Sequence, residues 1–264
     1  MKELTNDNPG LQFKRLALFG MSGLGKTFIS RNLTKTDNWS HYSVDYEIGQ
    51  LLFKDNHANL LKGFDIDNLT HLSNFLGKPG SSTMGGIPFS EYVSRQRLHR
   101  DAEIKATLKA CSLVEKSPEL SHFVCDTSGS ICELVNPSDK NDLLLTSISR
   151  NFLIVCLEAP DSIYQVLIDR FLAKPKPMYY EENFLNSLWH SFKSGSSNTD
   201  DKINPDDFMV FGFKALIERR KAIFDRISKN WGITLNFELL RRINNATDLT
   251  EAIKLKIESA IENP

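Results

Sequence analysis

The sequence contains no long apolar run and no excess of charge of either sign. No stretch approaches the roughly 18 consecutive apolar residues of a membrane-spanning helix, so we expect a soluble chain. The 32 basic and 33 acidic side chains give a formal net charge of -1, which supplies no overall attraction to nucleic acid or to an anionic membrane. Residues 1–9 lack both an apolar signal core and the Arg-rich pattern of a transit peptide, which predicts a cytoplasmic location.

Cysteine and histidine are too few, and too irregularly spaced, for a disulfide framework or a structural zinc site. The four cysteines form no C-x-x-C pair, and the six histidines show no H-x-x-x-H spacing. Three of the cysteines lie in or beside apolar runs, so we expect reduced, mostly buried thiols. With 264 residues, 41% of them hydrophobic, the chain is long enough to bury one full core.

Short apolar runs alternate with helical patterns along the chain. The runs predict five strands, near residues 16–19, 41–45, 122–125, 151–157 and 233–237. Strands that alternate with helices predict a three-layer α/β fold in which helices flank a five-stranded parallel sheet. We predict one domain, residues 1–264, with a core of 14–54, 90–172 and 205–264, an insertion at 55–89 and a lid and loop at 173–204. Polar residues 191–201 predict a surface loop.

A glycine-rich segment, Gly-Met-Ser-Gly-Leu-Gly-Lys-Thr, follows the first predicted strand and precedes a helical pattern. Its spacing is that of the P-loop, in which glycines let successive amides turn toward a phosphate and the helix adds its positive end. Lys26 is expected to reach the β- and γ-phosphates, and the Thr27 hydroxyl to ligate magnesium. We therefore predict ATP with Mg²⁺ as the ligand, held by Gly20, Ser22, Gly23, Leu24, Gly25, Lys26, Thr27 and Phe28. No N-K-x-D base-reading motif is present, which disfavours GTP.

Two aspartates, Asp45 and Asp126, follow predicted strands. Ligands of parallel sheets gather at the carboxyl ends of the strands, where both carboxylates and the glycine loop are expected to lie. A kinase needs a group that holds magnesium, for which Asp126 is the candidate, and one that orients or deprotonates an acceptor hydroxyl, for which Asp45 is the candidate. Aspartates in such places also cap helices and turns, and that alternative stays open.

Basic residues form two further candidates. Arg170, Lys174 and Lys176 accompany two prolines that end a helical pattern, and such a stiff basic segment suits a lid over a transferred phosphate. Arg100 and Glu103 align on one helix face, where the arginine would bind an anionic acceptor. The alternatives are a solvated surface loop and an exposed ion pair, and both remain open.

The order of these motifs resembles the shikimate kinase and gluconate kinase branch of P-loop small-molecule kinases. Ser43–Gly49 resembles the second strand of that branch with its acids, Arg100 with Glu103 resembles the substrate-binding F-R-x-x-E element, and R-F-L-A-K-P-K-P resembles the arginine-bearing lid. The turn D-T-S-G-S, Asp126–Ser130, stands where that branch has a glycine-rich turn, which implies that Gly129 helps to bind substrate. Arg219 and Arg220 precede the last strand, as an arginine does in several such kinases.

The chain departs from the shikimate kinase pattern at several points. Ser43 replaces the first aspartate of D-x-D, serines flank Gly129 where three glycines are usual, and the chain is longer. Shikimate is therefore disfavoured as the acceptor. The H-Y-S-x-D-Y arrangement of the second strand is closer to a poorly characterised group of bacterial P-loop ATPases.

Two functions follow from these patterns and remain open. One is an Mg²⁺-dependent phosphotransferase that moves the γ-phosphate of ATP to a small hydroxyl-bearing acceptor. The other is an ATPase, or a nucleotide-switched module, that acts on a protein partner through the long insertions. The intact Gly-Lys-Thr disfavours a sulfotransferase-like use of the loop.

Overall fold

In the computed structural model of the chain, the described residues are 15–36, 39–54, 65, 69–117, 120, 122–195 and 199–262. The targeting prediction for residues 1–9 and most of residues 55–68 of the predicted insertion lie outside them. Five strands form one sheet in the order β2-β3-β1-β4-β5, and every neighbouring pair runs parallel. The strands are β1 Arg15–Phe19, β2 Ser40–Ser43, β3 Phe123–Asp126, β4 Leu153–Glu158 and β5 Gly232–Asn236.

The three central strands, β3, β1 and β4, are almost wholly buried. They read as continuous apolar runs because helices cover both faces of a parallel sheet. Leu18 of β1 lies opposite Asp126 on one side and Val155 on the other. The glycine loop that follows Phe19 therefore leaves the middle of the sheet directly beside the end of β3.

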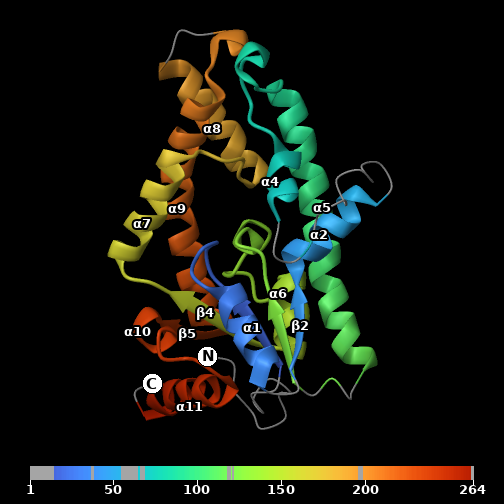
Figure 1. The fold of residues 1–264 in the computed structure, drawn as a ribbon, viewed down its shortest axis with the longest axis vertical. Coiled ribbons are helices and arrows are strands. Elements are labelled where there is room, and N and C mark those ends of the chain that lie inside the picture. The colour runs from blue at the N-terminus through green and yellow to red at the C-terminus, as the bar shows by residue number, and fades with distance from the viewer. Residues whose placement is uncertain are drawn as a thin grey trace. The chain divides into compact units, whose positions relative to one another are not determined.

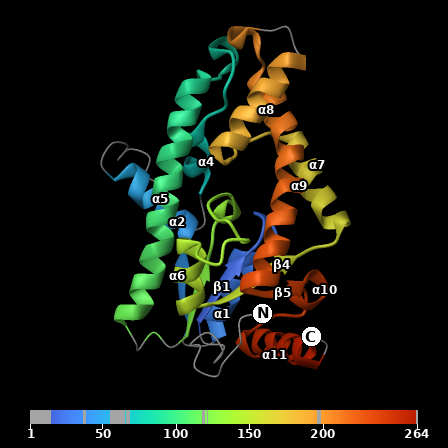
Figure 2. The same cartoon turned by 180° about the vertical axis from the view of Figure 1, so that it is seen from behind.

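Helices cover both faces of this sheet (Figures 1 and 2). Helices α1 (Lys26–Thr36) and α11 (Ala246–Glu262) lie on one face. The C-terminal parts of α5 (Phe89–Lys116) and α9 (Pro205–Trp231), together with α6 (Leu143–Asn151), lie on the other. This distribution is the one that right-handed crossovers produce for the observed strand order. The predicted architecture, a five-stranded parallel sheet between two layers of helices, is confirmed.

The chain divides into two compact units. The first, Met1–Val44, Lys105–Ser162 and Ala222–Pro264, contains all five strands. The second, Asp45–Ile104 and Ile163–Lys221, is helical and includes the described parts of both predicted insertions. Its elements are most of α2 (Val44–Phe53) and α7 (Asp161–Ala173), the N-terminal parts of α5 and α9, and α4 (Thr70–Leu76) and α8 (Glu182–Gly195), with the 3-10 turns Ser82–Met84 and Asp200–Lys202. The remaining short elements, Ile131–Glu133 and α10 (Phe237–Leu240), belong to the first unit.

Two local predictions were wrong. Strand β2 ends at Ser43, and Asp45 lies in the first turn of α2, where an acidic side chain complements the positive end of the helix. The loop predicted at 191–201 is helical as far as Gly195. Leu185, Leu188 and Trp189 form a buried face at helical spacing, and the helix that they anchor, α8, extends into the polar residues.

Two expectations from composition have structural counterparts. All four cysteines are buried free thiols, as predicted. Burial raises the pKa of the Cys111 thiol to about 12, which makes it a poor nucleophile. In the part of the chain that the structure describes, no helix is both long and apolar enough to cross a membrane.

Candidate functional site

The segment Gly20–Gly25 connects β1 to α1 through a backbone that requires glycine. Gly20, Gly23 and Gly25 have φ angles of 146°, 92° and 97°, a region that side-chain-bearing residues rarely adopt. At Gly20 a Cβ atom would also lie 3.2 Å from the carbonyl oxygen of Leu157. The backbone conformation therefore favours glycine at all three positions of the motif.

Lys26 is the first residue of α1, and its side chain is only 7% exposed. Its Nζ donates to the carbonyl oxygens of Gly20 at 2.7 Å and Met21 at 3.3 Å. The ammonium group therefore lies against the glycine loop. The first amides of α1 have no helical acceptor and add their positive end at the same place.

Thr27 and Asp126 are joined directly. The Thr27 Oγ1 donates to Asp126 Oδ2 at 2.6 Å, and the carboxylate, at the end of β3, is 5% exposed. Among the described residues there is no group of three or more His, Cys, Asp or Glu side chains that would form an all-protein metal cage. A hydroxyl and one carboxylate instead fit Mg²⁺, which usually keeps waters and takes the rest of its ligands from phosphate.

The turn after Asp126 packs tightly against the glycine loop. Thr127 Oγ1 donates to the carbonyl oxygen of Leu18 at 2.6 Å, and Ser130 Oγ donates to Ser128 Oγ at 3.2 Å. A Cβ atom at Gly129 would lie 2.7 Å from the backbone nitrogen of Ser22 and would also collide with its Oγ. This turn therefore supports one wall of the loop.

We expect Gly129→Ala to lower the free energy of unfolding by about 1–3 kcal/mol, the usual cost of overpacking a tight contact. The added methyl group meets backbone in the loop, which has to shift. Urea unfolding of the variant measures this cost. Gly195→Ala is the matched control, because a Cβ atom there meets nothing within 4 Å. Equal unfolding curves for the two variants would contradict the role of the contact.

The other residues predicted for the site belong to the second unit. Asp45 is partly buried in the first turn of α2. Arg100 is 46% exposed and donates to Asp101 Oδ1 at 3.2 Å, whereas Glu103 is fully buried, 3.5 Å from His99 Nδ1. The basic side chains at the end of α7 and beyond it, Arg170, Lys174 and Lys176, are exposed. Their roles at the site stay predictions.

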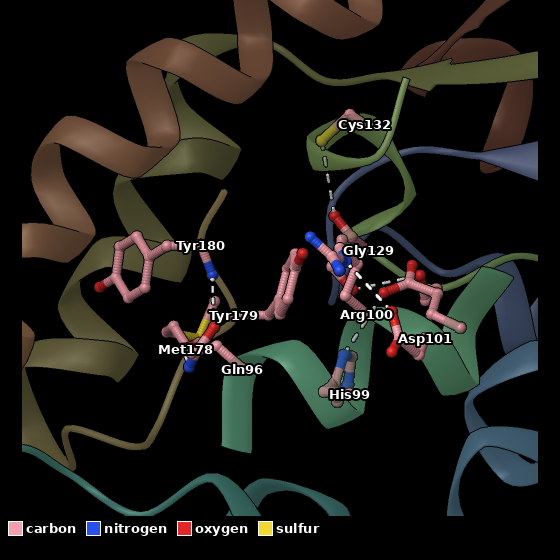
Figure 3. A network of polar contacts seen from close by, with 12 residues as sticks. Gln96, His99, Arg100, Asp101, Gly129, Cys132, Met178, Tyr179 and Tyr180 are labelled. Carbon is pink, nitrogen blue, oxygen red and sulfur yellow. Dashed lines mark hydrogen bonds and ion pairs between the residues drawn. The ribbon is translucent and has the colours of Figure 1, made fainter. Parts of the chain in front are cut away.

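The segment that follows Lys174 and Lys176 is anchored within the second unit, as Figure 3 shows. The carbonyl oxygen of Met178 accepts from Tyr92 Oη at 2.6 Å and Gln96 Nε2 at 3.0 Å, and the Tyr180 amide donates to Gln96 Oε1 at 2.9 Å. The buried Arg220, one of the two arginines noted in the sequence, donates to the carbonyl oxygen of Tyr179 at 2.7 Å. Residues 178–180, which follow Lys174 and Lys176 in the chain, are therefore fixed to α5 and α9.

Sequence reasoning missed His41 as a site residue. Its Nε2 lies 3.8 Å from Asp126 Oδ2, and its side chain is 10% exposed. The alternation of strand residues places His41 on the same face of β2 as Ser43, which pairs with Asp126. His41 could be assigned to the site only once β2 was known to pair with β3, and no local sequence pattern specifies that pairing.

No family model matches the sequence, and no curated protein matches it. Among solved structures, the chain is similar to shikimate kinase from Bacteroides thetaiotaomicron, with 15% identity and a TM-score of 0.41 over 94% of this chain and 98% of that chain.

Proposed function

We propose that this chain binds ATP with Mg²⁺ and transfers the γ-phosphate to a small hydroxyl-bearing acceptor. The observation that carries the proposal is the arrangement around the start of α1, where Lys26 lies against a glycine loop and Thr27 is bonded to Asp126. A phosphate chain needs inward-facing amides, a fixed cation and a magnesium site. The glycine loop, Lys26 and the Thr27–Asp126 pair, which would supply these three features, adjoin one another in the first unit.

The residues of the first unit supply the nucleotide-binding roles. The loop amides and Lys26 bind the phosphates, and the ammonium exchanges the carbonyl oxygens of Gly20 and Met21 for phosphate oxygens. Thr27 and Asp126 hold Mg²⁺ directly or through its waters, and Gly129 keeps the neighbouring turn against the loop. When bound, the metal neutralises charge on the phosphate oxygens.

Residues of the second unit supply the proposed transfer roles. Asp45 accepts the proton of the acceptor hydroxyl, and Arg100 binds an anionic group of the acceptor. Arg170, Lys174 and Lys176 stabilise the transferred phosphoryl group as a lid. The exposure of these basic side chains and the anchoring of residues 178–180 support a lid that is attached firmly at its end.

The alternative is an ATPase or a nucleotide-switched module that acts on a protein partner. It is favoured by the size of the second unit, which the two long insertions help to build. Screening sugars, polyols, hydroxy acids and nucleosides separates the two functions. Acceptor-dependent loss of ATP with a matching phosphorylated product supports transfer. Slow turnover that no acceptor stimulates, together with nucleotide-dependent retention of a protein, supports the alternative.

Lys26→Ala is the direct test of the nucleotide site. Hydrogen bonds to charged groups are worth about 1.5–3 kcal/mol, so we expect ATP affinity to fall about tenfold to a hundredfold. Calorimetry with ATP and GTP in the presence of magnesium measures the loss and the base preference. Lys35→Ala, an exposed lysine in the last turn of the same helix, is the control and should bind like the parent. Equal binding by Lys26→Ala and the parent would overturn the assignment.

A further inference from the structure

The Nε2 atom of His41 is a buried polar atom that lies beside Asp126, the carboxylate proposed to hold magnesium. Its Nε2 has less than 1 Å² of accessible surface and makes no hydrogen bond among the described residues. A buried polar group without a partner costs about 1–3 kcal/mol, so its position calls for a second state in which it is satisfied. Asp126 Oδ2 lies 3.8 Å from it.

The distance between His41 and Asp126 fits a contact that forms on a small movement. At 3.8 Å, Nε2 and Oδ2 are too far apart for a hydrogen bond, which needs about 2.7–3.2 Å. With less than 1 Å² of accessible surface, Nε2 is also closed to a bridging water. A shift of about 1 Å, within the reach of a side-chain rotation, brings the imidazole into hydrogen-bond range.

Asp126 has acceptor capacity left for this second donor. A carboxylate offers about four lone-pair sites, and Thr27 occupies one of them on Oδ2. The strand pairing holds the two groups together, because His41 and Asp126 lie on the same face of adjacent strands, two residues apart in register. In neutral imidazole one ring nitrogen carries a proton, so Nε2 is able to donate.

We propose that His41 is a positioning residue, which donates to Asp126 and fixes its carboxylate when ATP and Mg²⁺ are bound. This inference rests on the proposed nucleotide function. Carboxylates that serve metals are themselves held by hydrogen bonds, and removing such a partner usually costs about 10–100-fold in metal affinity. His41 acts on the metal through Asp126 and leaves the phosphate contacts of the glycine loop untouched.

The test separates the contribution of magnesium from that of the phosphates. The dissociation constant of ATP is measured by calorimetry with excess Mg²⁺ and again with EDTA. The constant in EDTA divided by the constant in Mg²⁺ gives the magnesium contribution to ATP affinity. In His41→Phe, which keeps a ring and loses the donor, we expect this ratio to fall about tenfold while the affinity in EDTA stays the same. In His41→Gln, whose amide can donate from a similar place, the ratio recovers.

Control variants distinguish a specific effect on magnesium binding from a general loss of structure. His122→Phe removes an imidazole that packs edge-on against Trp39 just before β2 and β3 begin, and it should keep the parent ratio. An unchanged ratio in His41→Phe overturns the inference, and so does an equal loss with Mg²⁺ and with EDTA, which marks a merely structural residue. Should His41→Phe not fold, His41→Leu removes the donor without a ring. Failure of the proposed function itself appears separately, as equal ATP binding by the parent and Lys26→Ala.

Discussion

In Asp126→Asn, we expect the gain in ATP affinity that magnesium provides to be about a hundredfold smaller than in the parent, equivalent to about 2.7 kcal/mol. The amide keeps the shape of the side chain and still accepts from Thr27, so the fold and the Thr27 contact are retained. What disappears is the negative charge that holds Mg²⁺ or its waters. ATP affinity in EDTA should stay the same or increase, since a carboxylate near the phosphates is removed.

The control for this variant is Asp142→Asn. Asp142 belongs to the same unit and caps α6 by accepting from the Leu145 amide at 2.9 Å, a bond that an asparagine oxygen also makes. Calorimetry with Mg²⁺ and with EDTA should give the parent ratio for it. If Asp126→Asn also kept that ratio, Asp126 would have no part in the magnesium site, and the role proposed for His41 would go with it.

His99 is expected to make stability strongly dependent on pH between 6.5 and 3. Burial, with the positive charge of Arg220 as a second cause, lowers the pKa of His99 from its ordinary 6.5 to about 3. The Glu103 side chain faces the same ring, with Oε2 3.5 Å from Nδ1. Below pH 6.5 the unfolded chain binds a proton that the folded chain refuses, so the free energy of unfolding falls by about 1.4 kcal/mol per pH unit. The full loss approaches about 5 kcal/mol at pH 3.

His99→Phe isolates this effect from the titration of carboxylates. The substitution removes the titrating group and keeps a ring stacked on Tyr179, whose ring centroid lies 5.0 Å away. Urea unfolding between pH 7 and pH 4 should give a much flatter profile for His99→Phe than for the parent. His190→Gln, at an exposed histidine in α8 of the same unit, should follow the parent. Parallel profiles for His99→Phe and the parent would contradict the low pKa.

Much of the fold follows from local patterns. Buried apolar runs mark the three central strands β1, β3 and β4, because a strand buried on both faces leaves no polar position to interrupt it. The stop at Lys174–Pro177 is equally local, since proline cannot continue α7. Polar residues proved a weaker signal, and α8 extends into a stretch that composition alone assigns to a loop.

The sequence by itself determined the glycine loop, the lysine and hydroxyl that follow it, and the alternation of strands and helices. Each of these depends on residues that are neighbours in the chain, where backbone freedom and side-chain reach decide the outcome. The tertiary structure alone decided that β3 lies between β1 and β2, which brings Thr27 and His41 to Asp126. It also decided that Glu103 faces His99, while the neighbouring Arg100 is half exposed. Such contacts join segments far apart in the sequence or depend on which helix face is buried, and only the packing of the whole chain settles both.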